Sequence, residues 1–324
     1  MASGMVTPKT PARKRSRQTL QPLKIPPSPF LESLGFGTGV NVWKLKESKS
    51  NSCQNSPWAI KNVRRNMSKA LKNKYENLIS KEANMLRSLC HENIIGFRDV
   101  ITSEDGRKCL AMELGGESLG NMIEERFENM LGPYPANLIL NVIKNVANAL
   151  AYLHDEKNIL HGDIKSYNIV VKNNFEVIKL CDFGVSINLD ENGVAHGFVG
   201  TPIYSAPECQ EGAEGPVTCK ADIFSLGLVI WEMIALVPPH TEVGGSEDES
   251  EYFSSCDSES EMDDSYISEA DSSVVKYGTR PNLPDVKLGD EYSNVIEIFY
   301  CCTEQDPNKR PTAHYLVQHL STLV

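Results

Sequence analysis

Features that would mark a secreted or membrane protein are missing from this 324-residue sequence. Its start lacks the apolar core of a signal peptide, and its nine cysteines form no CxxC spacing. The longest apolar run, residues 223–237, is short for a membrane span and is interrupted by Glu232. These absences predict reduced thiols, a buried helix at 223–237, no membrane association and a location in the cytoplasm and nucleus.

Each sign of charge is also missing from one long stretch. Residues 1–31 contain Lys and Arg but no acid, whereas residues 242–271 contain twelve acids and no Lys or Arg. Without those twelve acids the chain would carry +1 instead of −11, so its global acidity indicates little about partners. We expect a disordered basic regulatory tail at 1–29 and a disordered acidic insert at about 242–273.

The most informative stretch is 159–184, which contains HGDIKSYN (161–168) and DFG (182–184). Phosphoryl transfer needs a carboxylate at the acceptor hydroxyl, a cation on the transferring phosphate, and oxygen ligands for magnesium. Asp163, then Lys165, then the pair Asn168 and Asp182 supply these groups in that order. With this order and spacing the chain resembles the eukaryotic protein-kinase family. Combined with the acidic insert, Gly162 and the final Thr322-Leu323-Val324, the match resembles MAP-kinase-kinase-like members of that family.

The resemblance implies an α+β, bilobal protein kinase fold, with a small β-rich N-lobe that carries helix C and a larger, mainly helical C-lobe. We place the kinase domain at 30–321, with the lobes divided at about 114/115. ATP and Mg²⁺ are the implied cofactors, with Asp163 orienting the acceptor hydroxyl and Lys165 stabilising the transferring phosphoryl group. Asn168 and Asp182 are the implied metal ligands.

Residues 34–45 (LGFGTGVNVWKL) predict a strand, a glycine turn and a second strand, whose backbone can approach phosphates closely. Gly39 and Val40 stand where the family expects an aromatic residue and a glycine, so this loop is shifted. By resemblance, Met112 is the gatekeeper behind adenine and 113–115 form the hinge. The implied nucleotide-binding positions are Leu34, Gly35, Phe36, Gly37, Thr38, Gly39, Val42, Ala59, Lys61, Met112, Glu113 and Leu114.

Lys61 lies inside a buried-strand pattern at 58–63, where a lysine needs an anion to offset its burial. Within a helix read at 81–95, Glu82 shares the inner face with Leu86 and Leu89; a surface position for Glu82 is the alternative. The resemblance implies that Glu82 holds Lys61 against the α- and β-phosphates. Cys181 either faces the nucleotide pocket and reacts with electrophiles or is an inert buried thiol.

Residues 200–208 (GTPIYSAPE) resemble those of Ser/Thr kinases, in which Thr201 would bridge Asp163 and Lys165. Lys165 also favours Ser/Thr acceptors, and dual specificity stays open. Gly162 stands where most family members have an arginine that binds a phosphate on the activation loop. We therefore expect activation to depend less on loop phosphorylation than on the tails or a partner.

Two further family positions belong to the scaffold. Asp222 matches the aspartate that fixes the backbone of the catalytic loop, and a charge in so apolar a helix needs such hydrogen bonds. Glu208 and Arg310 match a buried ion pair of the C-lobe.

Short motifs in the tails suggest regulation and partners. Thr7, Thr10 and Ser28 each precede a proline, and Arg13 gives Thr10 the pattern of cyclin-dependent kinase sites; ordinary tail composition is the alternative. ARKRSR (12–17) could serve nuclear import, contact nucleic acid, or be only solvated. The acidic insert is a spacer or a docking site for basic partners. The sequence ends in Thr322-Leu323-Val324 (residues 322–324), which fits a PDZ groove that bonds Thr322 and seats Val324.

We expect an ATP-dependent protein kinase acting on Ser/Thr. The resemblance implies stress-activated MAP kinases as candidate substrates and a role in mitotic and stress signalling. The alternative is an ATP-binding pseudokinase scaffold that acts through its PDZ-type tail, favoured by the irregular glycine loop and Gly162. The complete set of Lys61, Glu82, Asp163, Asn168 and Asp182 favours the enzyme. A nucleic-acid binder through 12–17 has no recognition motif behind it.

Overall fold

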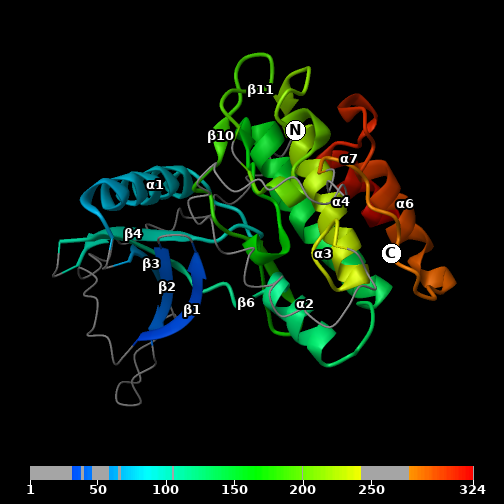
Figure 1. Ribbon diagram of the computed structural model, residues 1–324, viewed down its shortest axis with the longest axis horizontal. Helices are drawn as coiled ribbons and strands as arrows, with labels where there is room; N and C mark the ends of the chain where they lie inside the picture. The colour runs from blue at the N-terminus through cyan, green and yellow to red at the C-terminus, as the bar shows by residue number, and fades with distance from the viewer. Residues whose placement is uncertain are drawn as a thin grey trace, which may run out of the picture.

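Two lobes are joined at residues 114–116 in the computed structural model (Figure 1). The structure describes residues 31–37, 40–45, 58–64, 67–103, 106–198, 200–241 and 277–323, with the backbone alone for 31–37 and 44–45. The expected tail at 1–29 and the acidic insert at 242–273 lie outside the described residues. Within these ranges, no helix is both long and apolar enough to cross a membrane.

The smaller lobe is built on an antiparallel sheet with the strand order β1-β2-β3-β5-β4. The expected strand–turn–strand at 34–45 is present, although its first strand begins earlier, at Leu31. Strand β3 is buried from Ala59 to Val63 rather than on one face only, and Ile60 and Val63 are fully buried. The strands are β1 (Leu31–Gly37), β2 (Val40–Leu45), β3 (Trp58–Val63), β4 (Phe97–Thr102) and β5 (Lys108–Glu113).

Helix α1 (Lys69–Arg87) packs beside this sheet and carries Glu82 on its buried face with Ile79, Ala83 and Leu86. Ser68 caps its first turn, because its hydroxyl accepts a hydrogen bond from the Leu71 amide. The helix ends at Arg87, so the reading of 81–95 as helical was wrong beyond that point. Residues 88–96 instead form a loop that reaches the second lobe.

The larger lobe is mainly helical, and its centre is α4 (Lys220–Ala235), which is buried on every side from Ala221 to Ile234. A mainly apolar helix that is buried on every side belongs in a protein core, which confirms the buried helix expected at 223–237, although it ends at Ala235. Helices α3, α6 and α7 pack around it or against each other. The other helices are α2 (Leu119–Glu128), α3 (Ala136–Ala151), α6 (Ser293–Cys302) and α7 (Ala313–Thr322).

Short strands between the helices hold the loops of the interlobe region. A hairpin lies between the two motifs of 159–184, because β8 (Ile169–Lys172) pairs antiparallel with β9 (Val177–Leu180). β10 (Ile187–Asn188) pairs with β7 (Ile159–Leu160), and β11 (Val194–Ala195) pairs with β12 (Val217–Thr218). The segment 161–168 and the segment 182–201 are thereby both fixed at the face of the larger lobe next to the sheet. β6 (Glu117–Ser118) completes the small sheet with β8.

Candidate active site

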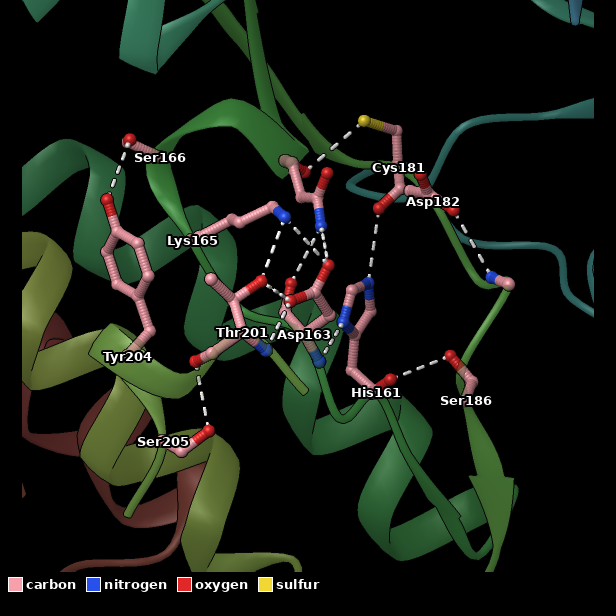
Figure 2. Close-up of polar contacts among 12 residues, drawn as sticks. His161, Asp163, Lys165, Ser166, Cys181, Asp182, Ser186, Thr201, Tyr204 and Ser205 are labelled. Atoms are coloured by element: carbon pink, nitrogen blue, oxygen red, sulfur yellow. Dashed lines mark hydrogen bonds and ion pairs between the residues drawn. The ribbon is translucent and has the colours of Figure 1, made fainter. Parts of the chain in front are cut away.

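Asp163 lies at the centre of a polar cluster formed by the segments 161–168 and 200–205 (Figure 2). The Thr201 hydroxyl donates a 2.6 Å hydrogen bond to Asp163 Oδ1, and the Thr201 amide donates to the same oxygen at 3.2 Å. Lys165 Nζ donates to Thr201 Oγ1 at 2.9 Å and lies 3.2 Å from Asp163 Oδ2. The bridge that Thr201 was expected to form between Asp163 and Lys165 is present.

Asn168 is oriented by the same carboxylate. Its amide nitrogen donates to the Asp163 backbone oxygen and to Asp163 Oδ2, both at 2.8 Å. Because the Asn168 side-chain nitrogen makes these two hydrogen bonds, the side-chain oxygen is the atom that can coordinate a cation. Oxygen is the ligand type that hard divalent cations prefer.

Lys61 forms an ion pair with one carboxylate in each lobe. Its Nζ lies 2.9 Å from Glu82 Oε2 on α1 and 2.9 Å from Asp182 Oδ1. The Lys61 and Glu82 side chains are almost fully buried, whereas the Asp182 side chain is 42% exposed. The pair expected between Lys61 and Glu82 is therefore present, and the surface alternative for Glu82 was wrong.

The charges of these three groups shift one another's pKa values. Burial alone would lower the pKa of Lys61, but Asp182 and Glu82 outweigh it and raise that pKa above its usual value. Burial would raise the pKa of Asp182, but Lys61 outweighs it and lowers the pKa to about 2. Burial raises the pKa of Glu82 to about 7 against the opposing effect of Lys61. Lys61 and Asp182 thus stay charged at neutral pH.

Asp222 on α4 fixes the backbone that leads into Asp163. Its two carboxylate oxygens accept hydrogen bonds from the amides of His161 and Gly162, each at 2.9 Å. His154 Nε2 lies 2.8 Å from Asp222 Oδ2, and the Asp222 side chain is buried. This is the contact to the loop backbone that the sequence predicted for Asp222.

His161 joins the two segments that carry Asp163 and Asp182. Its Nδ1 accepts from the Asp163 amide at 3.3 Å, and its Nε2 lies 3.2 Å from the Cys181 carbonyl oxygen. Its ring meets the edge of the fully buried Phe183 ring, with 4.8 Å between centroids. Asp182 has a φ of 62°, a strained value that these neighbours and Lys61 hold in place.

Cys181 lies directly before Asp182 and is hydrogen-bonded. Burial, with Asp182 as the next cause, raises the pKa of its thiol far above the usual value. Its Sγ donates to the Asn168 carbonyl oxygen at 3.4 Å. A protonated, hydrogen-bonded thiol is a poor nucleophile, which favours the inert alternative for Cys181.

The predicted nucleotide-binding positions lie together on neighbouring strands. Val42 pairs with Lys61 and Ala59 with Met112 across the sheet. Ala59 and Met112 are buried, and Val42 and Leu114 pack half-buried against the core. Of the glycine loop, the backbone of Leu34, Gly35, Phe36 and Gly37 lies in β1, and Thr38 and Gly39 lie outside the described residues.

One hinge residue, Glu113, makes contacts beyond those in the prediction. The Glu113 amide donates to the Gly96 carbonyl oxygen at 2.8 Å, so that amide is already bonded within the protein. The Glu113 carboxylate accepts from Lys179 Nζ at 3.0 Å and from the Gly96 amide at 3.1 Å. The Glu113 carboxylate therefore anchors the hinge to Gly96 and Lys179, and the sequence pattern did not predict these contacts.

A buried network around Glu232 was also missed. The Ser166 hydroxyl donates to Glu232 Oε1 at 2.8 Å and the Tyr204 hydroxyl to Glu232 Oε2 at 2.9 Å. Burial raises the pKa of Glu232 to about 8, because the two hydroxyls offset only part of the lost hydration. The interruption of the apolar run 223–237 was the signal in the sequence, and it indicates a buried acid that needs partners.

The ion pair predicted for the larger lobe is present. Arg310 makes the buried pair with Glu208 through two bonds, at 2.6 and 2.8 Å.

Thr322 is the last residue of α7, where its hydroxyl donates to the His319 carbonyl oxygen. A PDZ groove binds an extended strand, so this last turn would have to unwind. Thr7, Thr10, Ser28 and Val324 lie outside the described residues.

Comparison with known proteins gives consistent matches. Residues 29–320 match the family model of the protein kinase domain. The human lymphokine-activated killer T-cell-originated protein kinase is 42% identical over 305 residues, which cover 93% of this chain and 91% of that protein. Mitogen-activated protein kinase kinase kinase 3 of Arabidopsis thaliana is 28% identical over 243 residues, 74% of this chain and 34% of that protein. Serine/threonine-protein kinase dst2 of Dictyostelium discoideum is 30% identical over 248 residues, 76% and 19% of the two chains.

Proposed function

This chain belongs to the protein kinase family, and we propose that it transfers a phosphoryl group from ATP to serine and threonine hydroxyls of proteins. Protein kinases use ATP and a divalent metal ion. The contact that carries the proposal is the bridge of Thr201 to both Asp163 and Lys165. The similarity to a named serine/threonine kinase supports the same acceptor class.

The residues of the site fit a nucleotide and Mg²⁺. Asn168 and Asp182 offer one amide oxygen and one partly exposed carboxylate, a ligand set suited to a cation that also binds phosphates. ATP would supply the phosphoryl group, and the metal would neutralise charge on its phosphates. Lys61, held by Glu82, would bind the α- and β-phosphates, and the interstrand pairs of Val42, Ala59 and Met112 would contact the base.

The protein groups that act on the acceptor are Asp163 and Lys165. Asp163 would accept a hydrogen bond from the incoming hydroxyl and take its proton as the oxygen–phosphorus bond forms. Lys165, 3.2 Å from Asp163, would place its positive charge on the transferred phosphoryl group. Catalysis would then come from positioning and electrostatics. The complete polar cluster supports this enzymatic function over the pseudokinase alternative.

We also propose that the activation loop, between Gly184 and Thr201, reaches its active arrangement without being phosphorylated. Between Gly184 and Thr201 the sequence contains a single hydroxyl side chain, Ser186. Ser186 is fully buried and donates to the His161 carbonyl oxygen at 2.9 Å. Gly162, with a φ of 80°, replaces the arginine that would bind such a phosphate. Loss of all activity in a Ser186→Ala variant that folds normally, with Thr10→Ala fully active, would contradict this.

Regulation and partners are proposed from the tails. We propose that a cyclin-dependent kinase phosphorylates Thr10, with Thr7 and Ser28 as further sites, and that MAP kinases are candidate substrates in mitotic and stress signalling. Binding of a PDZ protein through Thr322 and Val324 requires that Val324 carries the free carboxylate. We place the protein in the cytoplasm and nucleus, which imaging of a fluorescent fusion tests.

The experiment for the acceptor class uses a generic basic protein as substrate and ATP with Mg²⁺. Mass spectrometry identifies the modified residues for the wild type, for Asp163→Ala and for the exposed control Asp285→Asn. We expect phosphoserine and phosphothreonine with the wild type and the control and none with Asp163→Ala. Phosphotyrosine in addition would establish dual specificity. Equal background in all three, with ATP still bound, would favour the scaffold.

A further inference from the structure

Strand β9 (Val177–Leu180) ends two residues before Asp182 and is held from the N-lobe as well as from its partner strand β8. Leu180 donates its amide to the Asn93 carbonyl oxygen at 2.8 Å, and its own carbonyl oxygen accepts from the Ile95 amide at 2.9 Å. Asn93 Nδ2 donates to the Ile178 carbonyl oxygen at 2.9 Å. The loop that follows α1 thus fixes one side of the strand that leads to the metal-binding position.

Lys179 adds a second connection, to the hinge. Its Nζ lies 3.0 Å from Glu113 Oε2, at the end of β5, and that oxygen also accepts from the Gly96 amide. The Lys179 side chain is 13% exposed and the Glu113 side chain 36%. The residues on either side of Glu113 are Met112 and Leu114, which border the proposed nucleotide site. One ion pair therefore joins the segment that faces the base to the strand that precedes Asp182.

We infer that Lys179 is a positioning residue for phosphoryl transfer, whose ion pair with Glu113 sets the nucleotide-binding hinge against the strand that leads to Asp182. This role rests on the kinase function proposed above. A nucleotide bound at the hinge must have its phosphates within reach of Asp182 and Lys61, so the separation of these two segments matters to affinity. Lys61 fixes Asp182 to α1, and Lys179 fixes the adjoining strand to the hinge.

The rival interpretation is an ion pair that contributes only to stability. Partly exposed ion pairs contribute at most about 1 kcal/mol, so stability alone cannot distinguish the two. Nucleotide affinity can, because a stabilising pair remote from the chemistry leaves the affinity of the folded protein unchanged. The position of Glu113 between two nucleotide-site residues predicts that affinity and stability change together.

The test measures the dissociation constant of Mg²⁺-ATP by calorimetry, together with kcat, the KM for ATP and the KM for a basic protein substrate. The variants are Lys179→Met, Lys179→Arg, Glu113→Gln and the double variant Lys179→Met/Glu113→Gln. Lys172→Met, an exposed lysine on the neighbouring strand β8, is the matched control. Thermal unfolding of each variant shows that it is folded.

We expect Lys179→Met to weaken ATP binding about fivefold, the size that a partly exposed ion pair can contribute. Lys179→Arg should restore affinity to within about twofold, since it keeps the charge. The double variant should bind no worse than the weaker single variant, and the KM for the protein substrate should stay constant.

Unchanged ATP affinity in Lys179→Met with lower thermal stability would overturn the proposal in favour of a purely structural pair. A higher kcat in that variant would also overturn it, because the pair would then restrain the active arrangement. If the wild type binds ATP but transfers no phosphate, the proposed function fails, while the affinities still decide the role of Lys179.

Discussion

Asp163 and Thr201, 38 positions apart in the chain, are joined by two hydrogen bonds to the same carboxylate oxygen, at 2.6 and 3.2 Å. The segment that would receive the protein substrate is therefore bonded directly to the proposed catalytic carboxylate. The other carboxylate oxygen of Asp163 accepts a hydrogen bond from the Asn168 side chain at 2.8 Å. The orientation of Asp163 thus depends on both the acceptor side and the metal side of the site.

The hydroxyl of Thr201 can be removed without removing its amide bond. We expect Thr201→Ala to lower kcat by about tenfold or more, because Lys165 loses an acceptor and Asp163 a donor. Thr201→Ser keeps the hydroxyl and should stay within about threefold of the wild type. Steady-state kinetics with a saturating protein substrate measures both. Equal losses in the two variants would show that the threonine methyl group, not the hydroxyl, is required.

Gly162 has a φ of 80°, and a Cβ there would meet Phe198 and the Val185 carbonyl oxygen only at 3.7 Å. We expect Gly162→Ala to lose about 1–2 kcal/mol of stability from backbone strain rather than from a clash. Gly193 has a φ of 75° with open space around it, so Gly193→Ala is the matched control. Both variants should be similarly destabilised in urea.

Only Gly162→Ala should also lose activity, by about tenfold, because the Gly162 amide bonds Asp222 one residue before Asp163. Full activity of Gly162→Ala would mean that backbone strain at residue 162 does not displace Asp163.

Arg310 is buried and makes two bonds to Glu208. We expect Arg310→Met to destabilise the protein by about 3–5 kcal/mol, because a buried carboxylate is left without its partner. The double variant Arg310→Met/Glu208→Gln should be more stable than Arg310→Met alone. Denaturant unfolding of the three proteins checks this, and additive losses would contradict the coupling.

Glu232 makes stability depend on pH. Its pKa is raised from 4.5 to about 8 in the folded state, so the folded protein binds more protons than the unfolded chain between those values. This contribution to the unfolding free energy is full below about pH 4.5 and falls as the pH rises through about 8. Glu232→Gln removes the titration.

The unfolding free energy of Glu232→Gln minus that of the wild type should therefore rise with pH, by at most about 4–5 kcal/mol. Urea unfolding at about pH 5 and about pH 8.5 covers most of this window. A difference that is constant with pH would show that Glu232 has the same pKa in both states.

The residues close together in the sequence were the ones that could be predicted best. Asp163, Lys165 and Asn168 lie within one short segment, so their order alone places them together. Lys61 and Glu82 could be paired because a buried lysine needs an anion and the helical spacing supplied one. Asp222 was found because a charge in an apolar helix needs hydrogen bonds.

What the sequence could not predict depends on contacts between distant segments. Glu232 meets Ser166 across 66 positions, and Lys179 meets Glu113 across the same separation. Neither periodicity nor a short motif reports which way such side chains point once the segments pack. The end of α1 at Arg87 was missed for the same reason, since apolar residues at 89–95 are buried by the second lobe and not by a helical face.

The most direct test of the account compares Asp163→Asn with the wild type in two measurements on the same preparations: the affinity for Mg²⁺-ATP and the rate of phosphate transfer to a basic protein. We predict that ATP affinity stays within about threefold while transfer falls by at least about 100-fold, because the substitution keeps the shape of the site and removes the proton acceptor. Transfer at an undiminished rate in Asp163→Asn would contradict the assignment of this cluster as the catalytic centre.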